Sequence, residues 1–123
     1  VRRQGGRPIG GYQAVQHACA GMFRDVESAR WLVWETAWKL EAGRADAHAA
    51  VAAAKVYAAD AALRVARRGH QVMGAIGYCE EHPLHLLHKR ILAASLDAGD
   101  AALHLDTVAR SIGLRSDPVR VRG

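Results

Sequence analysis

Three histidines in the second half of the chain have a spacing that could bind a metal ion. His82, His85 and His88 follow one another at steps of three, and the last two could share one face of a helix. Paired imidazoles are common ligands of zinc and other transition metals. No cysteine or carboxylate lies at a spacing that completes a ligand set, although Glu80 and Glu81 are close in sequence. We therefore expect exposed or interface histidines and no metal site.

The serines and glutamates do not form the patterns of other common active sites. Ser28, Ser95 and Ser111 lack the flanking glycines of a hydrolase nucleophile elbow. Glu27 and Glu35 lie on a similar face of one predicted helix, but other side chains separate them, so they make a poor acid–base pair. No glycine-rich phosphate loop follows a strand, because no strand is predicted. The residues by themselves therefore predict no reaction.

The net charge of +5 comes from the two ends of the chain. Six of the 17 Lys and Arg lie before Pro8 or after Leu114, against one of the 12 Asp and Glu. A nucleic-acid-binding protein more often concentrates basic residues on one face of a folded element. We therefore predict no nucleic-acid partner, and a solvated, disordered tail at residues 115–123.

Several features indicate a cytoplasmic location. Cys19 and Cys79 are too few for a disulfide framework and have no metal-binding spacing, which favours reduced thiols in an intracellular protein. The first residues are basic and glycine-rich, and no apolar run typical of a signal peptide follows them. No stretch approaches the ~20 apolar residues of a membrane span. The first residue is Val1, so we expect a fragment or a processed product.

Apolar residues recur at steps of three and four, a period typical of helices. Gly43 suits a helix C-cap, Asp46 and Asp100 suit N-caps, and Pro83 suits a first helical position. Short connections make neighbouring helices antiparallel. The predicted fold is all-α, an up-and-down four-helix-bundle-type domain with long antiparallel helices at residues 12–40, 46–73, 83–98 and 100–112.

Three tryptophans mark a second apolar face on the first predicted helix. Trp31, Trp34 and Trp38 lie on one side, offset from the aliphatic stripe. A helix that is apolar on two faces is central in its bundle or buried in an oligomer interface. We therefore expect structural packing, with a ring-stacking ligand site as the alternative.

Five short motifs follow one another along the chain. Residues 2–9 read RRQGGRPI, and residues 71–78 read QVMGAIGY before Glu81 and Pro83. The three motifs between them are Gln13 with Gln16; Ala20, Met22, Glu27, Ala29 and Arg30; and Ala54 with Lys55. In this order they resemble the C-terminal helical domain of the acyl-CoA dehydrogenase family. The resemblance implies such a domain over residues 1–114, with its first bundle helix missing.

The resemblance implies α,β-dehydrogenation of acyl-CoA thioesters in fatty acid or steroid side-chain β-oxidation. A carboxylate removes the α-proton, and FAD accepts a hydride from the β-carbon. It also implies a homo- or hetero-oligomer, a dimer or tetramer, and an electron-transfer acceptor. The isolated chain is expected to be inactive. The implied FAD-binding residues are Arg2, Gln13, Gln71, Val72, Met73, Gly74 and Ala75.

Three positions depart from the family pattern. The usual catalytic glutamate falls on Ala98, which cannot abstract a proton, and the neighbouring Asp97 is only a weak candidate base. The phenylalanine of the first motif is Gly5, and the second glycine of the last motif is Ala75. The missing base could lie on an upstream helix or in a partner subunit of a mixed oligomer. A non-catalytic interaction bundle of the same fold is the alternative.

Overall fold

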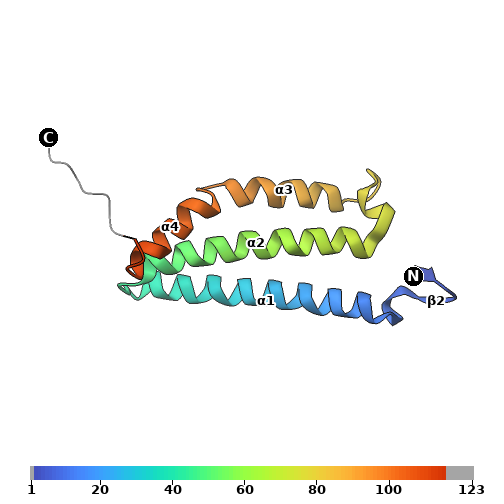
Figure 1. Cartoon of the computed structure of the whole chain (residues 1–123), viewed down its shortest axis with the longest axis horizontal. Coiled ribbons are helices and arrows are strands. Elements are labelled where there is room, and N and C mark those ends of the chain that lie inside the picture. Colours follow the sequence, from blue (N-terminus) through green and yellow to red (C-terminus); the bar gives the residue numbers. More distant parts are fainter. Residues whose placement is uncertain (1, 116–123) are drawn as a thin grey trace.

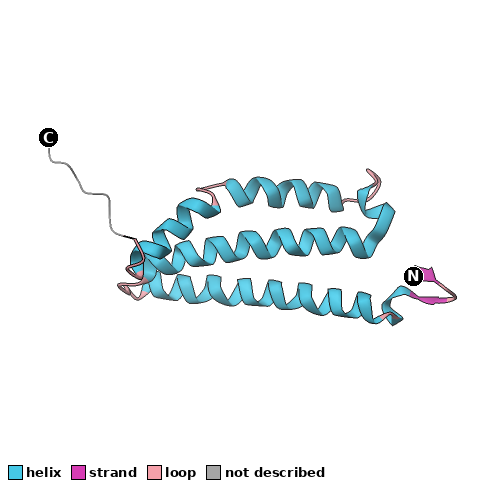
Figure 2. Cartoon of the chain, in the orientation of Figure 1, coloured by secondary structure: helices cyan, strands magenta, loops and turns pink. Residues whose placement is uncertain are grey.

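The computed structural model describes residues 2–115, and these residues are almost entirely helical (Figure 2). The all-α prediction is confirmed. Of the predicted tail at residues 115–123, only Arg115 lies within the described residues. The four helices are α1 (Gln13–Glu41), α2 (Ala47–Met73), α3 (Leu84–Leu96) and α4 (Ala101–Ser111).

The second helix is the centre of the domain (Figure 1). α1 runs antiparallel along one side of α2, and α3 and α4 together run along the opposite side (Figure 1). The chain reverses direction from α1 to α2 and again from α2 to α3, whereas α4 continues in the direction of α3, so α2 separates α1 from both (Figure 1). No helix within residues 2–115 combines the length and the apolar character that crossing a membrane requires.

The contacts between helices are built on small side chains. Within residues 2–115, the buried apolar side chains are all alanines of α2: Ala47, Ala52, Ala54, Ala61 and Ala66. Alanine lets neighbouring helix backbones approach closely, so α2 can pack against helices on two sides. Large apolar side chains lie mostly outside this contact, and many are more than half exposed, such as Phe23, Trp31, Leu86 and Leu96. The described residues therefore leave extensive apolar surface uncovered.

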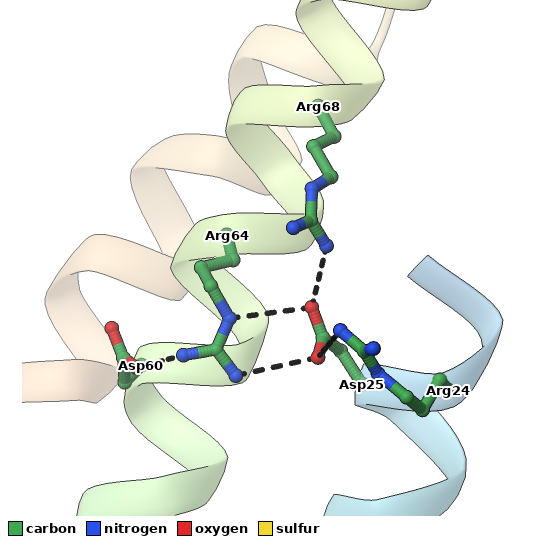
Figure 3. A network of polar contacts seen from close by, with 5 residues as sticks. All are labelled: Arg24, Asp25, Asp60, Arg64 and Arg68. Atoms are coloured by element: carbon green, nitrogen blue, oxygen red, sulfur yellow. Dashed lines mark hydrogen bonds and ion pairs between the residues drawn. The ribbon is translucent and has the colours of Figure 1, made fainter. Parts of the chain in front are cut away.

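A buried carboxylate joins α1 to α2 (Figure 3). Asp25 is 2% exposed, and its oxygens accept hydrogen bonds from Arg64 and Arg68 of α2. Arg24 approaches the same carboxylate to 3.6 Å, and Arg64 also pairs with Asp60. The hydrogen bond from Arg64 and the neighbouring positive charges lower the pKa of Asp25. The charged form of Asp25 therefore stabilises the α1–α2 contact.

The structure confirms some predicted helix ends and corrects others. Gly43 follows α1 with a φ of +61°, as its C-cap role requires. Asp100 accepts a hydrogen bond of 3.0 Å from the Leu103 amide and caps α4. Asp46 lies at the N-cap position of α2, but the predicted side-chain cap is absent. Its carboxylate lies instead 2.9 Å from Lys39 Nζ, which attracts it away from the helix end.

Helix α3 is shorter than predicted. It begins at Leu84, one residue after Pro83, which is its N-cap. It ends at Leu96 because Ala98 and Gly99 both have positive φ, at 57° and 103°. Left-handed backbone cannot continue a right-handed helix.

The prediction that the chain lacks strands is wrong at its beginning. β1 (Arg3–Gln4) and β2 (Arg7–Pro8) form a small antiparallel hairpin, and the short 3₁₀ helix η1 (Ile9–Gly11) follows it. Gly5 and Gly6 make the turn with φ of +56° and +78°. A two-residue glycine turn is a recognised hairpin signal, but the flanking residues have no strand-like alternation.

Candidate functional site

The N-terminal hairpin returns to the end of α2. The Arg2 guanidinium donates a hydrogen bond to the backbone carbonyl of Met73, the last residue of α2. The next residue, Gly74, has a φ of +64°, and a Cβ atom there would lie 2.9 Å from Arg2 Nη1. A glycine at this position therefore serves both the backbone turn and the close approach of the arginine. Two segments of the predicted site, far apart in sequence, are in contact.

Tyr12 holds the hairpin in place. Its hydroxyl donates a hydrogen bond of 2.8 Å to the Gln4 carbonyl, and the Arg7 guanidinium lies 3.8 Å from its ring centroid. The Ile9 amide donates to the Arg2 carbonyl at 3.1 Å. These contacts fix the backbone that carries Arg2, so the guanidinium is positioned by local structure rather than by Met73 alone.

A pocket of about 310 Å³ lies between the N-terminal segment and the end of α2. Its polar lining includes Arg2, Gln4 and Gln71, and its apolar lining includes Ile9 and Val72. A guanidinium favours phosphate oxygens, and the apolar side chains suit a ring or an alkyl group. The lining therefore fits one portion of a phosphate-bearing cofactor, and its volume is too small for a complete dinucleotide.

The pocket contains only some of the predicted cofactor residues. Arg2, Gln71 and Val72 line it, and Met73 and Gly74 contact Arg2 at its edge. Gln13 is the exposed first residue of α1, and Ala75 is exposed in the 3₁₀ helix η2 (Gly74–Tyr78). Neither is part of the pocket lining.

The turn between α3 and α4 presents no carboxylate at Ala98. The Ala98 carbonyl lies 3.0 Å from Nε2 of His104, and the Asp100 carboxylate is engaged in capping α4. A groove lies between α2, α3 and α4. Asp97 is the exposed C-cap of α3 and does not line this groove. The position of Asp97 therefore gives no support for a role as a base.

The histidine triplet does not assemble a metal centre. His82 Nδ1 accepts a hydrogen bond of 3.2 Å from the Leu84 amide, and His85 Nδ1 lies 2.7 Å from the His82 carbonyl. His88 instead packs beside His70, with ring centroids 5.0 Å apart. Within residues 2–115, no three His, Cys, Asp or Glu side chains are placed to hold a metal ion.

Sequence reasoning missed His70, which is only 4% exposed. The available signal was its position one helical turn after Ala66, on the alanine face of α2.

The three tryptophans of α1 remain on the surface. Trp31, Trp34 and Trp38 are 63%, 55% and 58% exposed. The first two rings meet edge to face, with centroids 5.0 Å apart. Packing within the described residues therefore does not cover this stripe, and it is available to another chain or segment.

Fold and site together define a class: a long-helix domain that carries a partial ligand pocket at one end and uncovered apolar faces along its sides. Residues 1–113 match the family model described as acyl-CoA dehydrogenase, C-terminal domain. The chain belongs to this family, as its ordered motifs indicate.

Individual relatives agree with this assignment. The chain is 31% identical to the mitochondrial short/branched chain specific acyl-CoA dehydrogenase of Bos taurus, covering 90% of this chain and 26% of that protein. It is similar in structure to the FAD complex of PigA, with a TM-score of 0.88 and 25% identity. That match covers 94% of this chain and 30% of the other. It is also similar to the ChsE4–ChsE5 complex of Mycobacterium tuberculosis, with a TM-score of 0.82 and 30% identity. That match covers 95% of this chain and 32% of the other. The chain spans less than a third of each relative's length.

Proposed function

We propose that this chain is the C-terminal domain of an FAD-dependent acyl-CoA dehydrogenase, which oxidises the α,β-bond of acyl-CoA thioesters. The observation that carries the proposal is the contact of Arg2 with Met73 and Gly74 beside a partly apolar pocket. This contact brings the first and last of the ordered family motifs together. The similarity to an FAD complex supports the choice of cofactor.

The chain's role toward FAD is to bind one portion of it. Arg2 would neutralise the pyrophosphate, because a guanidinium pairs well with phosphate oxygens. Gln71 and Val72 would contact the same ligand from α2, while Gln13 and Ala75 would do so from outside the pocket lining. Bound FAD supplies the hydride acceptor, and the residues of this chain orient it.

The proton-abstracting base lies outside the turn at Ala98. Two arrangements agree with the structure: a carboxylate on a preceding helix of the same protein, or one in a different subunit type. The second is favoured by the similarity to a complex of two named proteins, ChsE4 and ChsE5. In either case this domain supports a base that it does not carry.

The uncovered apolar surface supports oligomer formation. The Trp31, Trp34 and Trp38 stripe on α1 and the exposed leucines of α3 would be buried against other domains or subunits. We propose a dimer or tetramer that passes electrons to a separate acceptor protein. The free thiols of Cys19 and Cys79 agree with the expected cytoplasmic location.

The test is the visible absorption spectrum of the full-length protein, purified without added flavin. We expect the two-band profile of an oxidised flavin. Arg2→Ala should reduce the flavin content at least about tenfold, since it removes a charge-assisted contact. Arg44→Ala is the matched control, because Arg44 is exposed at the opposite end of α1 and should leave the flavin content unchanged.

A protein that stays colourless after FAD is added and excess is removed would reject this function. That outcome favours the second candidate, a non-catalytic interaction bundle of the same fold, for which Ala98 and Gly5 are the supporting observations. The chain of residues 1–123 alone should not reduce FAD with acyl-CoA, because it lacks the parts that would cover the flavin and the acyl chain. Bleaching of flavin by this chain would contradict that expectation.

A further inference from the structure

His70 is a buried imidazole with unsatisfied hydrogen-bonding capacity. It is 4% exposed, and neither ring nitrogen has a hydrogen-bond partner within residues 2–115. Its ring stacks on Tyr78 at a centroid distance of 4.6 Å and lies 5.0 Å from the His88 ring. Buried polar groups are nearly always hydrogen bonded, and an unsatisfied one is costly. A hydrogen-bond partner from outside residues 2–115 would therefore stabilise the His70 imidazole.

A pocket of about 290 Å³ lies beside this imidazole, between α2, η2 and α3. It shares no lining residue with the pocket at Arg2. Its volume is at the lower end of small-molecule sites, so it fits a small ligand or one group of a larger one. The lining residues are His70, Tyr78, His85, His88, Lys89 and Leu92.

The polar lining offers proton donors and no negative charge. Lys89 is exposed, carries three donors and forms no ion pair with an acid of residues 2–115. His85 is not among these donors, because its Nδ1 lies 2.7 Å from the His82 carbonyl, which only accepts, and its proton is therefore donated to the backbone. An ammonium group repels metal cations, whereas several N–H donors around a small space suit an oxyanion.

We propose that this pocket binds a small oxyanion, the carboxylate or phosphate group of a ligand, between Lys89, His88 and His70. Tyr78 covers the His70 ring but is itself 70% exposed, so rotation of its side chain into solvent uncovers the imidazole. Leu92 provides an apolar wall for the non-ionic part of the ligand. A bound oxyanion accepts a hydrogen bond from the N–H of His70 and also neutralises the charge of Lys89.

The test is an NMR titration of the full chain that follows the ring nitrogens of each histidine. Inorganic phosphate and acetate are added separately at constant ionic strength, and chloride is the reference anion. We expect saturable shifts of His70 and His88, while the exposed His17 and His48 do not move. A response to phosphate identifies a phosphate ligand, and a response to acetate alone identifies a carboxylate.

Two variants separate a built site from general attraction of anions. Lys89→Gln should weaken binding of the effective anion at least about fivefold, because it removes the single formal charge on the lining. Arg90→Gln removes a neighbouring exposed charge that does not line the pocket, and should change affinity less than about twofold. The proposal fails if both variants weaken binding equally, if no anion saturates the shifts, or if zinc chloride saturates them instead.

Discussion

Arg68 donates a hydrogen bond of 2.7 Å to Asp25 Oδ2, and so links α2 to a carboxylate of α1 that is only 2% exposed. Arg64, one turn earlier on α2, donates to the two oxygens of the same carboxylate at 3.2 and 3.4 Å (Figure 3). The longest helix pair of the domain is thus joined by a charge cluster as well as by alanine contacts. Such a cluster is sensitive to loss of its central member, because the partner charges then face one another.

Asp25→Asn should lower the free energy of unfolding of the chain by about 2 kcal/mol, since it leaves Arg64 and Arg68 without their shared carboxylate. The measurement is urea denaturation followed by circular dichroism. Glu27→Gln is the control, because its ion pair with Arg30 is more exposed and should contribute about 0.5 kcal/mol or less. Equal stability of Asp25→Asn and the unchanged chain would show that the cluster does not stabilise the helix pair.

The same cluster predicts a dependence of stability on pH. The hydrogen bond from Arg64 lowers the pKa of folded Asp25 below its ordinary value of 3.8. A lowered pKa adds stability that is fully present above the unfolded value and is lost as pH falls through the folded one. The stability difference between the unchanged chain and Asp25→Asn should therefore be constant near neutral pH and shrink below about pH 4. A difference that grows on acidification would contradict this assignment.

Asp100→Ala should destabilise the chain by about 1 kcal/mol, because it removes the hydrogen bond to the Leu103 amide that caps α4. Asp46→Ala is a matched comparison at the N-cap position of α2. It should cost less, because Asp46 makes no side-chain cap and its exposed carboxylate pairs with Lys39 instead. Thermal unfolding of both variants measures the difference. A larger loss for Asp46→Ala would reverse the assignment of the two roles.

Helical period and glycine punctuation were sufficient to predict the helices, because both act locally. The ends at Gly43, Gly74 and Gly113 follow from positive φ at each glycine. The end of α3 was missed because Ala98 also has a positive φ, which its residue type does not signal. Asp46 was misjudged because its nearest cation, Lys39, belongs to the preceding helix.

The candidate site could be predicted from the sequence only in part. The family motifs predict that Arg2 and residues 71–75 belong to one site, and the structure adds a contact between Arg2 and Met73. Gln13 could not be placed relative to the pocket, because its side-chain direction depends on where α1 begins. His70 carried no motif at all. Its burial follows from the packing of α2 against neighbours on two sides, which periodicity alone does not describe.

Gly74→Ala tests the contact between the hairpin and α2 directly. Gly74 has a φ of +64° and ψ of −146°, a backbone region that is nearly restricted to glycine. A new Cβ would also lie 2.9 Å from Arg2 Nη1, so we expect a loss of about 2 kcal/mol in unfolding free energy. Gly43→Ala is the control, because its φ of +61° is similar but its Cβ would meet nothing within 4 Å. It should cost about 1 kcal/mol.

The steric part of the Gly74→Ala effect should depend on the arginine. In the double variant Arg2→Ala with Gly74→Ala, the side chain that meets the new methyl group is gone, and only the backbone strain remains. The two changes should therefore be less than additive in urea denaturation. Arg2→Ala with Gly43→Ala should be additive, because Arg2 precedes the start of α1 and Gly43 follows its end. Additivity of the first pair would mean that Arg2 does not approach Gly74 in solution, and the proposed pyrophosphate contact would then lose its structural basis.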